Sequence, residues 1–311
     1  MIAFGPIPTR RLGYSLGINN IPPKYCSYSC IYCQVGKAVR MDIQRKEFYS
    51  PQEIADQVTE KVRLAKRNNG RIDYLSFVPD GEPTLDLNLG ATIQKLKSLD
   101  IPVAVITNGS LLWREDVQQD LMDVNWICVK VDAHTMPVWK RVNHPVKTLD
   151  YPVMLSGIGA FRKQFRGIFT TETMLVKGLN DSENEINAIA RFIAGVRPDT
   201  AYLAIPTRPP AVKSVRPPDE KQLTKAYQIF STRINHVELL TGYASAGFGT
   251  TGNTAEDILS IASVHPIRED GMQAILDKAG HGWSLVEELV KNRNLVETRY
   301  RGQRFFVRKI I

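Results

Sequence analysis

The sequence predicts an α/β protein in which parallel strands alternate with helices, followed by a small C-terminal domain. Two observations lead to this prediction. Six apolar runs with the length of strands alternate with helical stretches, which favours a parallel sheet with helices on its outside. Beyond residue 240 the chain changes to a run of small residues and then to short helical patterns. A chain of 311 residues is long enough for one large domain and one small domain.

The elements of the large domain follow from local patterns. In the helix predicted over 50–66, Ser50 can cap the N-terminus, Pro51 fits the first turn, and apolar residues recur on one face. The other predicted elements, in chain order, are strand 10–19, strand 72–78, helix 88–99, strand 103–106, strand 126–131, helix 152–164, strand 167–176, helix 182–194 and strand 201–205.

The C-terminal part divides into a linker and a compact unit. We predict a large domain over 1–240, a linker over 241–253 and a second domain over 254–311. The predicted elements of the second domain are helices 254–262, 269–278 and 284–291 and strands 295–300 and 303–309. Three helices and a hairpin resemble a winged-helix domain.

The predicted hairpin is basic. Its cations, set against Glu297 alone, are Arg293, Arg299, Arg301, Arg304, Arg308 and Lys309. In winged helices that bind nucleic acid, such cations contact phosphates. Docking of a protein or peptide is the alternative, and Glu287 and Glu288 in the third helix argue against simple insertion into a groove.

Composition sets the class of the protein. Hydrophobic residues make up 43% of the chain, and 40 basic against 32 acidic residues give a net charge of +8. This charge is compatible with a nucleic-acid partner but does not require one. The N-terminus lacks the pattern of a signal peptide, and no apolar stretch approaches the ~18 residues of a membrane span. We therefore expect a cytoplasmic protein with no membrane partner.

The most informative stretch is a cysteine motif. Cys26, Cys30 and Cys33 have Cys-x3-Cys-x2-Cys spacing, and Tyr32 precedes the last of them. Thiolates at such close spacing can converge on one soft metal centre, and cysteine thiolates hold iron–sulfur clusters. A 4Fe–4S cluster needs one ligand for each iron, so three cysteines leave one iron open to a substrate or cofactor.

Two other interpretations of the cysteines are weaker. A disulfide would leave an odd thiol, and nothing marks the chain as secreted. A structural zinc site needs four ligands, and no nearby histidine or second cysteine pair completes one. The fourth cysteine, Cys128, stands alone in an apolar run and is typical of a small core residue. The chain therefore lacks the cysteines for an auxiliary cluster.

The cysteine motif, with its aromatic residue before the third cysteine, resembles that of the radical S-adenosylmethionine (radical SAM) superfamily. This resemblance implies a partial (β/α)6 barrel of TIM type, with its chemistry at the C-terminal ends of the strands. It also implies that the open iron chelates the amino and carboxylate groups of S-adenosylmethionine. The reduced cluster then cleaves it to a 5′-deoxyadenosyl radical that abstracts a hydrogen atom. An external one-electron reductant of flavodoxin or ferredoxin type would be a partner.

A second motif follows the strand predicted over 72–78. Gly81, Glu82 and Pro83 resemble the family's Gly-Gly-Glu-Pro motif, which implies that they bind the ammonium group of S-adenosylmethionine. Asp80 replaces the first glycine of that motif. An ordinary turn is the alternative for this stretch.

Two more strand ends carry polar residues. The resemblance places Thr107 and Asn108 on the S-adenosylmethionine side of the barrel, although they too fit an ordinary turn. Lys130 and Asp132 are two residues apart and so share a face of their strand. Facing the barrel interior, either could touch the ribose or the substrate. A structural ion pair is the alternative.

Later segments add weaker expectations. Residues 173–181 resemble the fifth-strand segment that meets the adenine, although Asn180, Asp181 and Ser182 can equally cap the next helix. The basic, proline-rich loop over 205–218 is a candidate for holding an anionic substrate, or else a rigid connector.

Residues 10–19, 21–24 and 208–210 resemble a group of iron–sulfur oxidoreductases related to the wybutosine-synthesis radical enzyme of tRNA. Our leading hypothesis is a radical SAM enzyme that modifies a macromolecule, most plausibly tRNA. A radical SAM activase or modifier of a protein or peptide is the second. A winged-helix regulator whose cluster senses redox state is the third, and the intact motif at 81–83 argues against it. The substrate is not identified by the sequence.

Overall fold

The computed structural model describes residues 2–68, 70–242, 253–264 and 266–308. In this part of the chain, an eight-stranded sheet has the order β1-β2-β5-β6-β7-β8-β9-β10. β1 is antiparallel to β2, and the other neighbouring strands are parallel. The strands are β1 (Ala3–Thr9), β2 (Gly13–Ile18), β5 (Tyr74–Phe77), β6 (Val103–Thr107), β7 (Trp126–Lys130), β8 (Ile168–Met174), β9 (Thr200–Ala204) and β10 (Val237–Leu240).

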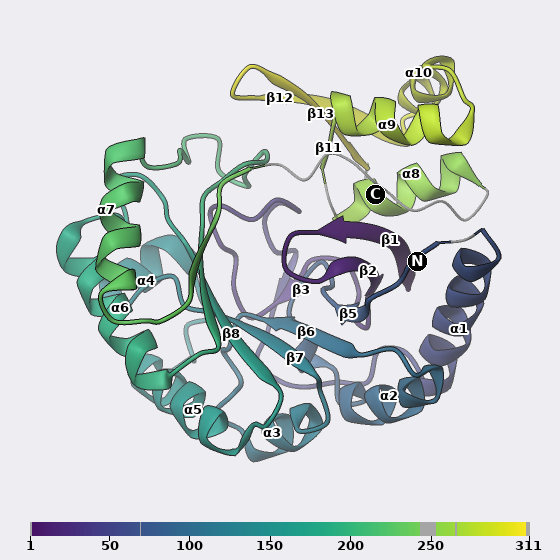
Figure 1. The fold of residues 1–311 in the computed structure, drawn as a ribbon. Helices are drawn as coiled ribbons and strands as arrows, with labels where there is room; N and C mark the ends of the chain where they lie inside the picture. Colours follow the sequence, from purple (N-terminus) through teal and green to yellow (C-terminus); the bar gives the residue numbers. More distant parts are fainter. Residues whose placement is uncertain (1, 69, 243–252, 265, 309–311) are drawn as a thin grey trace.

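Helices cover the outer face of this curved sheet (Figure 1). They are α1 (Pro51–Arg67), α2 (Leu89–Leu96), α3 (Glu115–Leu121), α4 (Met136–Asn143), α5 (Tyr151–Gln164), α6 (Glu183–Val196) and α7 (Glu220–Ser231). The prediction of a partial barrel with outer helices is confirmed. None of the described helices is long and apolar enough to cross a membrane.

Side chains alternate between the two faces of the sheet. In β6, Val103 and Val105 belong to the core beneath the helices, whereas Ala104 lies in a separate interior cluster. Cys128 belongs to that interior cluster and is fully buried, as the sequence predicts for a small core residue. Leu12, from the turn between β1 and β2, packs in the same cluster. The turn that precedes β2 thus helps to fill the barrel interior.

Several elements escaped prediction for physical reasons. β1 contains two prolines, which weaken a strand pattern. Residues 10–12, which we assigned to the first strand, form the turn between β1 and β2. α3 and α4 have only 7 and 8 residues. α7 was not predicted either, although Leu223, Ala226 and Phe230 recur on one face and pack against the core.

The C-terminal part contains the predicted helices and strands. The elements are α8 (Thr254–Val264), β11 (Ile267–Arg268), α9 (Glu269–Ala279), α10 (Ser284–Lys291), β12 (Leu295–Tyr300) and β13 (Gln303–Arg308). The short β11 was not predicted and pairs with β13. Most of the predicted linker, residues 243–252, lies outside the described residues, as does Lys309. The domain boundaries and the winged-helix assignment stay predictions.

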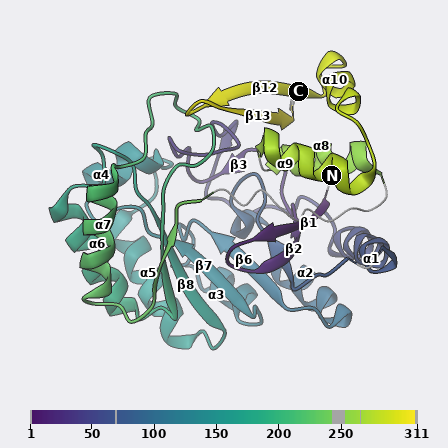
Figure 2. The ribbon, with the colours of Figure 1, turned by 45° about the horizontal axis from the view of Figure 1, so that its top comes forward.

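This C-terminal part contacts the edge strand β1 and the segment that follows β9. Phe4 and Ile7 of the edge strand β1 share an apolar core with α8, α9, α10 and the small sheet. On the far side of the sheet, the Tyr300 hydroxyl donates at 3.3 Å to the carbonyl oxygen of Pro206, which follows β9, the neighbour of the edge strand β10. The β12–β13 hairpin therefore lies beside the C-terminal ends of the barrel strands (Figures 1 and 2).

Candidate active site at the cysteine loop

The three cysteines lie on a loop that follows β2. Two short strands brace this loop, β3 (Tyr25–Cys26) and β4 (Arg40–Met41), which pair in parallel. The amide N–H of Cys33 donates to the Cys30 carbonyl at 3.1 Å and closes a tight turn. All three thiols are free and partly buried. The loop thus presents its sulfurs at the C-terminal end of the barrel, as predicted.

The predicted turn at 80–83 is joined to this loop through its backbone. The Lys24 N–H donates to the Asp80 carbonyl at 2.7 Å, and the Glu82 N–H donates to the Tyr25 carbonyl at 3.2 Å. A Cβ atom at Gly81 would lie 1.9 Å from the Tyr25 carbonyl oxygen. Only glycine permits this close approach. The motif glycine therefore has a structural role in seating the cysteine loop.

The Glu82 carboxylate joins the two predicted motifs to each other. It is 1% exposed. One oxygen accepts from the N–H and hydroxyl of Thr84, at 3.1 and 2.6 Å, and from the Thr107 hydroxyl at 2.6 Å. The other accepts from the Asn108 N–H at 2.7 Å. Burial raises the pKa of Glu82, and these hydrogen bonds oppose the shift. These hydrogen bonds join the turn that follows β5 to the end of β6.

The sulfur atoms receive N–H donors from neighbouring elements. Cys26 accepts from the Tyr28 N–H at 3.4 Å and from the Asn108 amide at 3.6 Å. Cys30 accepts from the Asn143 amide at 3.3 Å. Burial raises the pKa of the Cys30 thiol to about 12, with Asp132 adding to the effect. Donors aimed at sulfur are what iron-bound thiolates use, so this environment fits a 4Fe–4S cluster.

Across the described residues, no three His, Cys, Asp or Glu side chains are close enough to ligate a single ion. A 4Fe–4S cluster does not require such convergence, because each thiolate binds a different iron. The fit to a cluster rests on the spacing, partial burial and N–H donors of the three cysteines.

Asp132 lies at the centre of a buried polar network. One carboxylate oxygen accepts from the Tyr32 hydroxyl and, at 2.7 Å, from the Asn143 amide. The other accepts from the Met174 N–H at 2.9 Å, and the Asn180 amide donates to the Asp132 carbonyl at 2.7 Å. Burial raises the pKa of Asp132, opposed first by the Lys130 ammonium. The structure thus brings together Tyr32 and Asp132, which lie 100 residues apart in the sequence.

Lys130 forms an ion pair, but its partner is not Asp132. Its ammonium pairs with Glu172 of β8, which also pairs with Arg11 from the β1–β2 turn. Burial alone would raise the pKa of Glu172, but Lys130 and then Arg11 outweigh it and lower the pKa to about 2. The Lys130 ammonium also lies 5.5 Å from the Tyr32 ring centre. The sequence analysis singled out neither Glu172 nor Arg11, because their contact spans 161 residues.

The end of α4 clamps the cysteine loop, and this too was not predicted. The Ser29 N–H donates to the carbonyl oxygens of Asn143 and His144, both at 3.1 Å. The Ile31 N–H donates to the Val142 carbonyl at 3.0 Å. Further along, the Val146 N–H donates to the Ser27 carbonyl at 2.9 Å. The carbonyl groups at a helix C-terminus lack partners within the helix, so here they are used to hold the loop.

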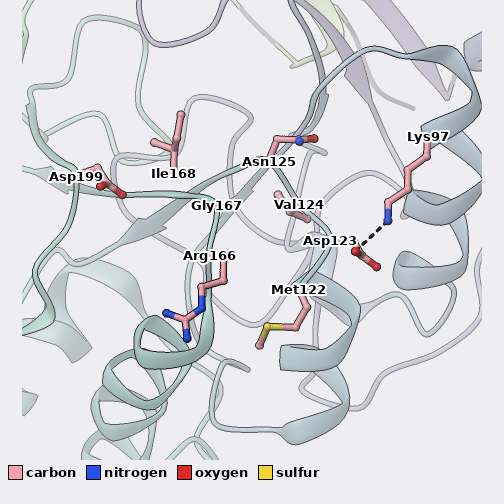
Figure 3. Close-up of a pocket in the computed structure, with 9 residues that line it drawn as sticks. All are labelled: Lys97, Met122, Asp123, Val124, Asn125, Arg166, Gly167, Ile168 and Asp199. Carbon is pink, nitrogen blue, oxygen red and sulfur yellow. Dashed lines mark ion pairs between the residues drawn. The ribbon is translucent and has the colours of Figure 1, made fainter.

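A hollow of about 570 Å³ lies at the opposite end of the barrel (Figure 3). Its lining comes from the segments that precede β7, β8 and β9, and includes the Lys97–Asp123 ion pair at 2.9 Å. In barrels of this type the chemistry occurs at the C-terminal ends of the strands. The cysteine loop, not this hollow, is therefore the candidate site.

Asp80 gives the apoprotein a testable pH dependence. The residue is 3% exposed, and burial raises its pKa from 3.8 to about 7, with Lys24 opposing the shift. A raised carboxyl pKa means that the folded state binds the proton more tightly than the unfolded state. The protonated form thus stabilises the fold at low pH, and that contribution is lost as the pH rises from about 4 to about 7.

We expect Asp80→Asn to remove this dependence. Between pH 4.5 and pH 8, the free energy of unfolding of the variant should rise relative to that of the wild type by about 3 kcal/mol. Urea unfolding of both apoproteins at the two pH values measures the change. If the free energies of unfolding of the two proteins differ by the same amount at both pH values, the pH dependence does not come from Asp80.

Comparison with known proteins places this site in context. A sequence profile described as the Radical SAM superfamily matches residues 20–193. A UPF0026 protein of Methanocaldococcus jannaschii is 43% identical over 311 residues, which span 99% of this chain and 96% of that protein.

Two solved structures are similar in fold. A radical SAM methyltransferase from Sphaerobacter thermophilus has a TM-score of 0.55 at 14% identity, covering 74% of this chain and 67% of that chain. A structure of TYW1 with a lysine–pyruvate adduct bound has a TM-score of 0.52 at 14% identity, covering 71% of this chain and 74% of that chain. At this identity the likeness is one of fold.

Proposed function

Because this chain belongs to the radical SAM superfamily, we propose that it is a radical SAM enzyme whose substrate is a macromolecule, tRNA. The observation that carries the proposal is the cysteine loop at the barrel mouth, with N–H donors aimed at Cys26 and Cys30. When bound, a reduced 4Fe–4S cluster supplies the electron that cleaves S-adenosylmethionine to a 5′-deoxyadenosyl radical.

Different residues of the chain are assigned to the cluster and to S-adenosylmethionine. We assign the three cysteines to the cluster. The backbone around Gly81 lies against the loop, and Gly81 and Glu82 are assigned to the ammonium group of S-adenosylmethionine. The remaining proposed contacts with S-adenosylmethionine are made by Tyr32, Pro83, Thr107, Asn108, Lys130 and Asp132.

A basic surface beside the barrel mouth supports an anionic macromolecule as substrate. We call it the basic rim and define it as Lys213, Arg216, Arg299 and Arg301, all exposed. The last two come from the β12–β13 hairpin and the first two from the loop after β9. Arg301 and Arg216 both lower the pKa of the Tyr300 phenol, which burial raises, so the two segments lie close together. Exposed cations at a site entrance favour a polyanion.

One predicted member of the basic hairpin is occupied elsewhere. Arg304 pairs with Glu269 at 3.0 Å and Glu297 at 2.8 Å, and its guanidinium lies 5.7 Å from the Trp283 ring centre. It is therefore a structural residue of the C-terminal part, and the basic rim does not include it.

Substitution of the hairpin cations tests the tRNA proposal. We expect the double variant Arg299→Ala/Arg301→Ala to bind bulk tRNA about ten-fold more weakly, with a smaller dependence of log K on log salt by roughly one to two units. Lys66→Ala/Arg67→Ala removes the same charge from exposed positions at the end of α1 and is the matched control. Fluorescence anisotropy over a series of salt concentrations measures both quantities.

Equal losses in both double variants would mean that only net charge matters. Unchanged affinity in the hairpin variant would remove tRNA from the proposal and favour a protein or peptide substrate. Radical chemistry at the cysteine loop would stand in either case.

A further inference from the structure

We infer that Asn143 is a positioning residue that couples Cys30 to Asp132 and raises the reduction potential of the bound cluster. The inference rests on the proposed cluster at the cysteine loop and goes beyond it, because the resemblance to the family assigns no role to this asparagine. It arises from a contact between residues 113 positions apart in the chain.

The geometry of the Asn143 side chain carries the inference. Asn143 is the last residue of α4 and is 2% exposed. Its Nδ2 atom donates to the Cys30 sulfur at 3.3 Å and to an Asp132 carboxylate oxygen at 2.7 Å. A carboxamide nitrogen carries two hydrogens, so one nitrogen can serve both acceptors. The amide therefore lies between a cluster ligand and a buried carboxyl group.

The chemistry of this position explains why asparagine suits it. Cys30 binds iron as a thiolate, and Asp132 is negative when ionised, so the two acceptors repel each other. A neutral group that donates to both reduces the repulsion without adding charge. Aspartate at position 143 would offer no N–H and would add a third negative group. Serine has one hydrogen and could serve only one acceptor at a time.

The backbone around Asn143 fixes the amide in place. The carbonyl groups of Val142, Asn143 and His144 accept hydrogen bonds from the Ser29 and Ile31 amides of the cysteine loop. The Trp139 indole, one turn earlier in α4, donates to the Tyr28 hydroxyl at 3.1 Å. The helix end and the loop are thus one rigid unit. These contacts hold the Asn143 donor toward the Cys30 sulfur.

This arrangement has a consequence for electron transfer. Hydrogen bonds to cluster sulfurs and thiolates help to set the potential of iron–sulfur sites. Reduction adds negative charge, and an N–H donor stabilises the more negative state. Removal of the donor therefore makes the cluster harder to reduce. The same change leaves the Tyr32 hydroxyl as the one side-chain donor to that Asp132 oxygen among the hydrogen bonds described above.

Redox titration of three variants tests the inference. Wild type, Asn143→Ala and Asn143→Ser are reconstituted without oxygen, checked for iron content and folding, and titrated with EPR detection of the reduced cluster. Asn187→Ala is the matched control, because this partly buried asparagine of α6 donates to its own helix, at the Glu183 carbonyl at 2.9 Å.

We expect the reduction equilibrium of Asn143→Ala to fall about ten-fold, a shift of about 59 mV to more negative potential for one electron. Asn143→Ser should lie between it and the wild type, and Asn187→Ala should match the wild type. The serine variant keeps the test decisive should the alanine variant fail to fold. A purely structural role would lower iron content or thermal stability without moving the potential.

The outcomes separate this inference from the proposed function. If the wild type and an Asn143 variant both contain a full cluster and have the same reduction potential, the inference is wrong and the proposed function stands. A folded wild type that takes up no 4Fe–4S cluster would overturn the proposed function and the inference with it. A negative shift confined to the Asn143 variants would support both.

Discussion

Cys30→Ala is expected to abolish cleavage of S-adenosylmethionine, to the background of the assay. Cys30 is one of three thiols available to a cluster in the loop, and the fourth cysteine of the chain lies in the barrel interior. Loss of one thiolate leaves an iron without a protein ligand. The fold should persist, because the loop is also held by backbone hydrogen bonds to α4 and to the turn at 80–82. Iron content and 5′-deoxyadenosine formation under anaerobic conditions measure the effect.

Cys128→Ala is the matched control for this experiment. Cys128 is fully buried, its sulfur lies 3.8 Å from an Arg11 nitrogen, and its removal should cost only about 1 kcal/mol of stability. We expect its iron content and activity to equal those of the wild type. If Cys30→Ala kept a full cluster and wild-type activity, the cysteine loop would not be the cluster site.

Glu172→Ala is expected to cost about 3–5 kcal/mol in free energy of unfolding, since it leaves two largely buried cations without their shared partner. The Glu172 side chain is 6% exposed, and the Arg11 and Lys130 side chains are each 21% exposed. The exposed pair of Glu183 with Lys225, at 2.5 Å, provides the control. Glu183→Ala should cost less than about 1 kcal/mol, because solvent screens that pair.

The same carboxylate predicts the acid sensitivity of the fold. Its pKa is lowered to about 2 from an ordinary value of 4.5, so the unfolded state binds the proton more tightly. The stabilisation is therefore complete above about pH 4.5 and is lost as the pH falls toward 2. Urea unfolding at pH 7 and pH 3.5 should show a smaller cost of Glu172→Ala at the lower pH. If Glu172→Ala lowered the free energy of unfolding at pH 7 by less than Glu183→Ala does, the ion pairs of Glu172 with Arg11 and Lys130 would not stabilise the fold.

Much of the barrel could be predicted because its elements follow from local patterns. Strands such as β6 and β7 are continuous apolar runs, and helices such as α1 combine a cap with an apolar face. The spacing of the cysteines is likewise local. By contrast, β1 contains two prolines and α4 has only 8 residues, so neither shows a clear local pattern. Both elements depend on tertiary packing.

The supporting residues of the candidate site could not be predicted for the same reason. Asn143, Glu172 and Arg11 contact the candidate site or the barrel interior across more than 100 residues of sequence. Nothing in their immediate neighbours distinguishes them. One local signal existed at Glu82, since a glutamate followed two residues later by threonine can accept hydrogen bonds from that threonine. That signal indicates a structural role for the Glu82 side chain within its own turn.

The central claim is that this chain generates a radical from S-adenosylmethionine at the cysteine loop. Its most direct test is the yield of 5′-deoxyadenosine from the anaerobically reconstituted protein with S-adenosylmethionine and a strong reductant, with and without bulk tRNA. We expect 5′-deoxyadenosine to form, and to form faster when tRNA is present. A slow rate that is indifferent to tRNA would keep the radical chemistry and exclude tRNA as substrate. No 5′-deoxyadenosine from a sample with a full cluster would contradict the enzyme assignment itself.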